Sequence, residues 1–404
     1  MKKILKVLLG TTFLVLLMTL FLGNNVLAAT MNCTITFEDS EGGNEHYIIK
    51  YDDDTTSDKL YSGSSVESGN KITLQASPEE GYRFAYWLYN VYGETKKLSE
   101  KTSVTFTIKH SYTFTAVYVK EGSYVVTFGD NSEDVIYDYQ IVEKGENAKS
   151  IDTPSKKGYS KRGWSGSLNN ITEDLYLKPV YKATVWSVFR DYAPDFFKGL
   201  GLTLAFSVIS VFLALFLGAV LCLLRISSIK PLSFLSGAYI EIVRGVPLLL
   251  QLLLVYALMP RIAYGKFLNS EVIAAILTLF LNSGAYVAEI FRAGIQAVDK
   301  GQMEAGRALG LSKWTTMKKI ILPQAVKNVL PSIGNELIMV IKETSLASTV
   351  DAGIGELMSV KKQITSATFI NIPPFVVIAA MYFVVTFTLS KVVRYIERRL
   401  EARD

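Results

Sequence analysis

An uncharged run from Gly199 to Leu224 constrains the fold of this chain more than any other feature of its sequence. The run is longer than the roughly 20 apolar residues that a helix needs to cross a bilayer. Because 50% of its 404 residues are hydrophobic, the chain is too apolar for an ordinary soluble protein. The run therefore predicts an α-helical membrane protein.

Four later segments are also predicted to cross the membrane, which gives five core spans in all. They cover about Leu232–Met259, Val272–Val298, Gln324–Val350 and Ile372–Ser390. The third of these four is poorly hydrophobic, because Lys327, Glu336, Lys342 and Glu343 interrupt it. Pro247 predicts a kink in the first of them.

The basic residues between these spans lie mostly on one side of the membrane. That side holds Arg225, Lys230, Lys300, Arg307, Lys313, Lys318, Lys319, Lys391, Arg394, Arg398 and Arg399. The other side holds only Arg261, Lys266, Lys361 and Lys362. Cytoplasmic loops carry such an excess, which predicts a multi-pass plasma-membrane protein with a cytoplasmic C-terminus. The net charge of +5 follows from these loops, and it indicates no nucleic-acid partner.

Residues 1–29 have the features of a secretory signal. Lys2, Lys3 and Lys6 precede an apolar run from Val7 to Leu22, and small residues follow around Ala28. We expect cleavage after Ala28, with an uncleaved anchor helix as the alternative because the apolar run is long. Either outcome places the following residues outside the cell.

The residues from about Asn32 to Lys182 are predicted to be β-rich, with an internal repeat. Gly81-Tyr82 precedes Trp87 by the same spacing as Gly158-Tyr159 precedes Trp164, and each copy ends on a Val-Tyr pair. Two copies of one small unit fit this pattern, over residues 32–120 and 121–183. We expect Tyr82, Trp87, Tyr159 and Trp164 to be core residues of these units, because small units have few other large side chains to bury.

The second copy resembles the internalin-type B-repeat, a small β-grasp-like module. The matching stretches are Lys157-Gly158-Tyr159, Gly163-Trp164, Ile171–Leu175 and Pro179-Val180-Tyr181. The first copy is a divergent relative of the same module. The resemblance implies a small extracellular β-rich domain.

The segment from Glu304 to Pro323 is basic, amphipathic and lies between two predicted spans. Glu304 begins a short helix that ends where Gly310 supplies the positive φ typical of a helix C-terminus. Ser312 is then the N-cap of a second short helix, and Pro323 marks the start of the next element. Two short helices with a bend between them would form a compact projection suited to a groove on a partner, although an ordinary basic loop fits the same features.

This segment resembles the EAA motif of ABC-importer permeases, in which it docks on a separate ATPase subunit. The matching positions are Glu304, Ala305, Gly310, Ile320, Leu322 and Pro323. The chain departs from the motif at Gly306, where the family usually has alanine; glycine costs a helix roughly 1 kcal/mol, so a looser turn is expected there. We call Glu304–Pro323 the coupling segment. The resemblance implies that Glu304, Ala305, Gly306, Gly310, Leu322 and Pro323 contact the ATPase.

The whole of residues 196–404 resembles the polar-amino-acid branch of ABC-importer permeases, the histidine/glutamine type. The matching stretches are Gly199–Leu204, Glu241–Leu249, Asn282–Arg292, Gly334–Glu336, Lys342–Leu346 and Glu397–Leu400. The resemblance implies a type I importer fold and a dimer of permease subunits, either homo- or heterodimeric. It also implies two ATPase subunits and an extracellular amino-acid-binding protein.

Polar side chains within the predicted spans are costly unless they face a partner or a water-filled path. One interpretation is a path for a zwitterionic or charged amino acid, lined by Asn282, Ser283, Glu289, Glu336, Glu343, Thr344 and Ser345. The other is pairing between side chains, such as Glu241 with Arg244 or Glu289 with Arg292. Pairing is favoured for Glu241, Arg244 and Arg292, whereas both interpretations stay open for Glu289 and Glu336.

The sequence contains no Gly-x-x-x-x-Gly-Lys-Ser/Thr stretch, so ATP would be hydrolysed on another polypeptide. No nucleophile–base arrangement and no Cys/His cluster is present, so we expect neither a catalytic residue nor a cofactor or metal. The expected function is a permease subunit that imports polar amino acids. The alternative is a surface adhesion or sensing protein whose permease-like region serves mainly as an anchor.

Overall fold

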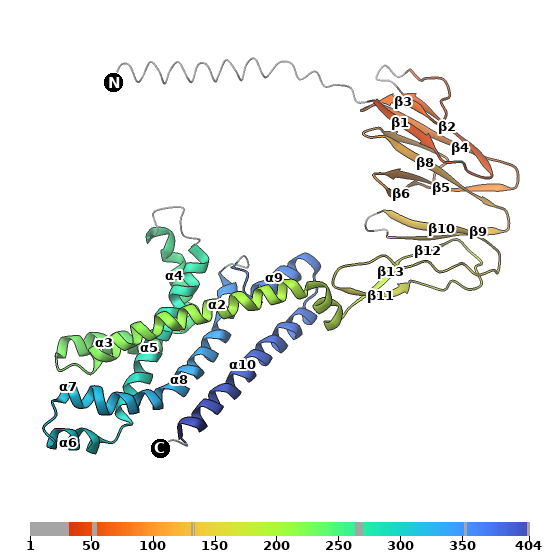
Figure 1. Cartoon of the computed structure of the whole chain (residues 1–404). Coiled ribbons are helices and arrows are strands. Elements are labelled where there is room, and N and C mark those ends of the chain that lie inside the picture. Colours follow the sequence, from red (N-terminus) through yellow and green to blue (C-terminus); the bar gives the residue numbers. More distant parts are fainter. Residues whose placement is uncertain are drawn as a thin grey trace, which may run out of the picture. The chain divides into compact units, whose positions relative to one another are not determined.

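The structure, a computed structural model, describes residues 32–401 except for 51–54, 131, 133, 263–269 and 351–353. It divides into two compact units (Figure 1). The β-rich unit runs to Pro154 and includes Lys161–Tyr181, and the helical unit contains Ser155–Ser160 and the chain from Lys182 onward. The predicted signal or anchor over residues 1–29 lies outside the described residues.

Several strands of the β-rich unit alternate buried and more exposed side chains, as the sequence predicts. The strands are β1 (Asn32–Phe37), β2 (Gly43–Lys50), β3 (Ser64–Glu67), β4 (Lys71–Pro78), β5 (Tyr82–Val91), β6 (Glu94–Ser99), β7 (Ser103–Thr107), β8 (Tyr112–Lys120), β9 (Ser123–Asp130), β10 (Val135–Glu143), β11 (Tyr159–Trp164), β12 (Leu175–Leu177) and β13 (Pro179–Ala183). In β4, for example, Ile72, Leu74 and Ala76 are buried and their neighbours are not.

One sheet runs through both repeats. Its eight strands follow the order β12-β9-β10-β6-β5-β8-β1-β3, while β2-β4-β7 form a three-stranded sheet and β11-β13 a two-stranded one. The repeats join where Val135 of β10 pairs with Lys96 of β6. Backbone hydrogen bonds therefore join the two repeats into one sheet. No pattern in the sequence predicts this pairing.

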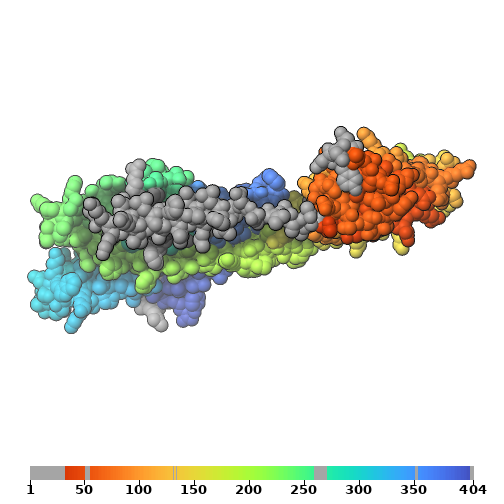
Figure 2. All heavy atoms as spheres, turned by 90° about the horizontal axis from the view of Figure 1, so that it is seen from above, coloured from red at the N-terminus to blue at the C-terminus, as the bar shows by residue number. Residues whose placement is uncertain are grey.

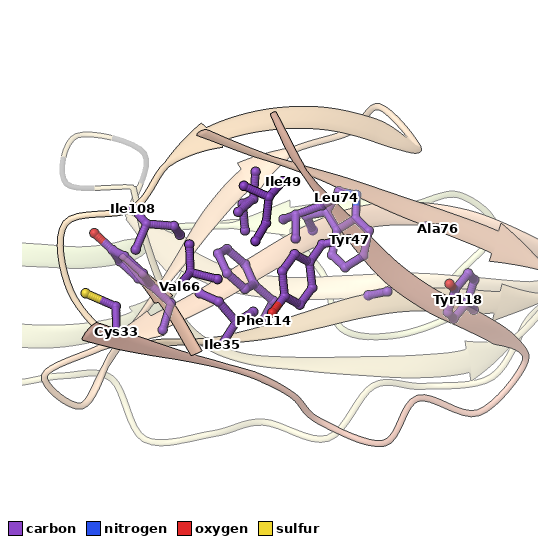
Figure 3. Close-up of a cluster of buried hydrophobic side chains, with 14 residues drawn as sticks. Cys33, Ile35, Tyr47, Ile49, Val66, Leu74, Ala76, Ile108, Phe114 and Tyr118 are labelled. Atoms are coloured by element: carbon purple, nitrogen blue, oxygen red, sulfur yellow. The ribbon is translucent and has the colours of Figure 1, made fainter. Parts of the chain in front are cut away.

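The first repeat has the aromatic core that the sequence predicts. Trp87 is fully buried, and side chains from β1, β2, β3, β4 and β8 point toward one another around Phe114 (Figure 3). In the second repeat, Trp164 packs edge-on against Phe128 with ring centroids 4.9 Å apart. The prediction for Tyr159 was wrong, because this side chain packs in a core of the helical unit.

The helical unit contains the predicted apolar runs as long helices. They are α2 (Val185–Arg225), α3 (Lys230–Gly245), α4 (Leu248–Ile262), α5 (Ser270–Gln296), α6 (Lys300–Ala308), α7 (Lys313–Thr316), the π-helical turn η1 (Met317–Ile321), α8 (Leu322–Glu343), the 3₁₀ turn η2 (Thr344–Thr349), α9 (Leu357–Thr368) and α10 (Ile372–Glu401). Among the described residues, α2, α5 and α10 are each long and apolar enough to span a bilayer. The pair α3 and α4, bent by 106°, gives a fourth candidate if it is counted as one span.

The bend between α3 and α4 lies at Val246-Pro247, which confirms the predicted kink. Proline cannot donate a backbone hydrogen bond, so the bend leaves carbonyl groups without helical partners. The amide of Gln251 donates to the carbonyls of Val243 at 2.7 Å and Val246 at 2.8 Å. This side chain therefore supplies the donors that the broken helix lacks.

Close packing between α2 and α5 depends on two glycines. A Cβ atom on Gly218 of α2 would lie 2.5 Å from Val287, and one on Gly284 of α5 would lie 2.6 Å from Leu217. Small residues allow two helix backbones to approach in this way. Gly218 and Gly284 therefore hold the positions where α2 and α5 approach each other closely.

Candidate functional site

The coupling segment begins in α6 and turns sharply at its end. The N–H of Leu311 donates to the carbonyl of Gly306 at 3.1 Å, and the N–H of Gly310 donates to that of Arg307 at 3.0 Å. Gly310 has a φ of +81°, and the pattern is a Schellman motif. Ser312 then caps α7 by accepting from the N–H of Thr315 at 3.1 Å. The predicted helix end at Gly310 and N-cap at Ser312 are both confirmed.

Gly306 lies at the contact between α6 and α7, which corrects the expectation of a merely looser turn. Gly306 and Thr316 are both buried. A Cβ atom on Gly306 would lie 2.5 Å from Cγ2 and 2.9 Å from Oγ1 of Thr316. The Thr316 hydroxyl is itself fixed, because it donates to the carbonyl of Ser312 at 3.0 Å. Glycine is therefore the residue that lets the two helices meet.

The sequence suggested a separate short helix after Ser312. The structure instead continues this second helix of the coupling segment into α8. Backbone angles stay helical from α7 through η1 into α8, and Pro323 is the second residue of α8, directly after the π-helical turn. The side chains of Leu309 and Trp314 are 81% and 70% exposed. Figures 1 and 2 place α6 and α7 at the end of the helical unit opposite to α9. The segment thus presents exposed apolar side chains, and its basic residues Arg307, Lys313, Lys318 and Lys319 are exposed as well.

Two of the predicted path residues meet across two helices. The Ser283 hydroxyl of α5 donates to Oε1 of Glu336 of α8 at 2.6 Å. Ser283 is buried and Glu336 is partly buried. A short hydrogen bond to a carboxylate is of the strong, charge-assisted kind. This contact joins α5 to α8 through their polar side chains.

Asn282 contacts a residue that the sequence interpretation missed, Gln251. The amide of Asn282 donates to Oε1 of Gln251 at 3.4 Å. Glu343 lines a very small cavity of about 10 Å³ together with mostly apolar residues of α4, α5 and η2. Only the polar side chain of Gln251, which interrupts the apolar α4 run, could have indicated this position.

The remaining path candidates lie elsewhere. Thr344 and Ser345 donate within their own helical turn, each at 2.7 Å, to the carbonyls of Ile341 and Lys342. Glu289 is paired with Arg292 at 2.6 Å, and it lines a separate groove of about 470 Å³ beside Arg244, Tyr286, Asn328 and Ser332. Glu241 pairs with Arg225 at 3.4 Å, not with Arg244 as the sequence suggested.

The sequence matches three protein families. Residues 210–402 match the binding-protein-dependent transport system inner membrane component. Residues 54–122 match the divergent InlB B-repeat domain, and residues 124–175 match the Listeria-Bacteroides repeat domain. The predicted resemblance of both parts is confirmed.

Known proteins similar to this chain are amino-acid permeases. The arginine transport system permease protein ArtQ of Bacillus subtilis (strain 168) is 39% identical over 211 residues, which cover 52% of this chain and 94% of ArtQ. The glutamine transport system permease protein GlnP of Escherichia coli (strain K12) is 33% identical, covering 54% of this chain and 97% of GlnP.

A solved structure described as an amino acid ABC transporter with histidines matches at 42% identity and a TM-score of 0.51, covering 54% of this chain and 99% of that one. These relatives are permease subunits and not enzymes, and they favour a permease over an adhesion protein. With near-complete coverage of such relatives, this chain belongs to the family of inner-membrane permease components of binding-protein-dependent transport systems, in its amino-acid branch.

Proposed function

We propose that this chain is the permease subunit of an ATP-driven importer of polar amino acids, and that the coupling segment passes the motion of an ATPase to the spans. The observation that carries the proposal is the fixed bend of this segment. Gly306 packs on Thr316, the Schellman motif fixes Gly310, and Leu309 and Trp314 extend outward. A rigid bend with exposed apolar side chains can transmit displacement, whereas a mobile loop would absorb it.

The proposed subunit has five spans, formed by α2, α3 with α4, α5, α8 and α10. The helix α8 is counted because its ionisable residues can face a polar path, although its hydropathy is low. The β-rich unit would be extracellular and the coupling segment and C-terminus cytoplasmic, which the distribution of basic residues supports. The division at residues 29, 120, 183 and 196, and the β-grasp character of the repeats, remain predictions.

The proposed substrate path centres on Ser283 and Glu336, with Asn282, Gln251 and Glu343 nearby. Carboxylates can hold the ammonium group of an amino acid, and amide and hydroxyl groups can pair with its polar atoms. ArtQ and GlnP are named for arginine and glutamine transport, so arginine and glutamine are the first substrates to test. The partners we propose are two ATPase subunits, a second permease subunit and an extracellular amino-acid-binding protein.

Changes in the coupling segment test its role. Gly310→Val should lower uptake of labelled arginine or glutamine about ten-fold and reduce copurification of the ATPase. A β-branched residue at positive φ costs about 1–2 kcal/mol, and space is not the cause, because no atom of the described residues lies within 4 Å of a Cβ there. Glu304→Ala should act similarly, since this carboxylate is exposed.

Gly310→Asn is the matched control, because asparagine tolerates the left-handed conformation. This variant should keep most of the uptake. If Gly310→Val and Glu304→Ala both leave uptake and ATPase copurification unchanged, the proposed coupling role is contradicted.

Labelling of single cysteines tests the orientation. In a chain with Cys33 and Cys222 replaced by serine, Lys313→Cys should react with a membrane-impermeant maleimide only after the cells are permeabilised. Lys109→Cys, an exposed position of the β-rich unit, should react on intact cells. Reaction of Lys313→Cys on intact cells at the rate of Lys109→Cys would contradict the orientation.

A further inference from the structure

Six residues that belong to the second repeat by sequence lie in the helical unit. Ser155–Ser160 come between β10 and the end of the repeat, yet they group with the chain from Lys182 onward. They include Lys157-Gly158-Tyr159, a stretch on which the B-repeat resemblance depends. We call Ser155–Ser160 the docking loop.

The docking loop is held on the first turns of α2. The N–H of Gly158 donates to Oδ2 of Asp191 at 2.8 Å, and the buried Ser187 hydroxyl donates to the carbonyl of Gly158 at 2.9 Å. The Lys157 ammonium lies 4.3 Å from the ring centroid of Tyr192, within the range of a cation–π contact. Both backbone groups of one residue are thus paired with α2.

The same loop contacts the turn that joins α9 to α10. The Tyr159 hydroxyl donates to the carbonyl of Thr368 at 3.1 Å. A Cβ on Gly158 would lie 2.9 Å from Cδ1 of Ile370. Between these two contacts, Phe369 has a φ of +58°, an uncommon conformation for a non-glycine residue. The docking loop therefore bridges α2 and a turn whose backbone is strained.

The bridged turn connects to the proposed substrate path through α9. Lys362 of α9 donates to the carbonyl of Ser348, in the 3₁₀ turn that also holds Thr344 and Ser345. The N-cap of α9, Glu356, is fully buried and accepts from the N–H groups of Met358 and Ser359 at 2.7 Å each. Displacement of the α9–α10 turn would therefore reach the helix that carries Glu336 and Glu343.

We propose that Gly158 and Tyr159 are positioning residues for transport. By tying the start of α2 to the α9–α10 turn, the docking loop keeps α9 and η2 in the arrangement that couples substrate movement to ATP hydrolysis. This inference rests on the proposed transport function. It also assigns a role within the permease to residues that the sequence places in the second repeat.

The test uses two pairs of variants in the full chain, expressed with its ATPase and binding protein. Tyr159→Phe removes the hydroxyl bonded to Thr368, and its control, Tyr181→Phe, removes a hydroxyl bonded at 3.1 Å to the carbonyl of Pro154 in the β-rich unit. Gly158→Ala is compared with Gly122→Ala. The two glycines have φ values of +85° and +86°, but in the part of the chain that the structure describes a Cβ at Gly122 meets nothing within 4 Å.

Uptake of labelled arginine and glutamine is measured together with ATP hydrolysis in proteoliposomes. We expect Tyr159→Phe to lower the maximal uptake rate and the amino acid moved per ATP about five-fold, the factor that one lost hydrogen bond can change. The KM should stay unchanged, because neither residue is placed in the substrate path. Gly158→Ala should lower both quantities at least as much, and the two control variants should match the unaltered chain.

If Tyr159→Phe and Gly158→Ala move as much amino acid per ATP as their controls, the inference is overturned while the proposed function stays intact. A raised KM with an unchanged maximal rate would also overturn it, since that result would indicate a binding role. Absence of uptake by the unaltered chain would instead overturn the proposed function, and this inference with it. Tyr159→Phe keeps the ring in its apolar core, so the test does not depend on whether Gly158→Ala folds.

Discussion

Replacing Gly306 by alanine should lower amino-acid uptake about ten-fold, although alanine favours a helix by about 1 kcal/mol over glycine. The new Cβ would lie 2.5 Å from a buried methyl group of Thr316, so α6 and α7 must separate or distort. Overpacking of this kind costs about 1–3 kcal/mol, which exceeds the gain in helix propensity. Uptake of labelled arginine or glutamine, and the amount of ATPase that copurifies, measure the effect.

A second substitution at the contacting residue distinguishes this explanation from a general loss of folding. Thr316→Ala removes both atoms that a Cβ on Gly306 would meet within 3 Å. The double variant should therefore recover most of the uptake that Gly306→Ala loses. Full activity of Gly306→Ala alone would show that the contact between α6 and α7 does not matter for coupling.

Replacing Glu336 by alanine should lower the ratio of the maximal uptake rate to KM about 100-fold. The substitution removes the acceptor of the 2.6 Å hydrogen bond from Ser283 and a carboxylate that we place in the substrate path. A hydrogen bond to a charged group is worth about 1.5–3 kcal/mol, and a buried hydroxyl left without its partner adds to the loss. Glu336→Gln, which keeps an acceptor but no charge, should lose less.

Glu289→Gln is the control for this prediction. Glu289 is also an acidic residue of a helix that carries path candidates, but its carboxylate is engaged by Arg292 at 2.6 Å. Glutamine can still accept from Arg292, so uptake should change less than three-fold, about 0.6 kcal/mol. Equal losses in Glu336→Ala and Glu289→Gln would contradict the assignment of the path to Glu336.

Local features of the coupling segment could be predicted because their causes are local. A glycine three residues before a polar Lys-Trp-Thr-Thr run, with a serine between them, specifies a helix end and an N-cap through backbone φ and short-range hydrogen bonds. The role of Gly306 could not be predicted in the same way. Its partner, Thr316, becomes a neighbour only after the chain has turned at Gly310.

The substrate path illustrates the same limit over a longer distance. The polar residues of the spans are visible in the sequence, but their pairing is not, because Ser283 and Glu336 lie on different helices. Before the helices are packed, Glu289 is as good a candidate as Glu336. The structure separates them, since one meets a hydroxyl of a facing helix and the other an arginine one turn along its own.

By itself, the sequence determined that apolar helices follow a β-rich repeat region, and where the coupling segment bends, because hydrophobic runs, strand alternation and glycine positions act over a few residues. Only the tertiary structure decided that both repeats share one sheet, that Gly306 is a contact and that Tyr159 belongs to the helical unit. Each of these features depends on which surfaces meet after the chain has folded. The free energy of such contacts cannot be predicted from any short stretch of residues.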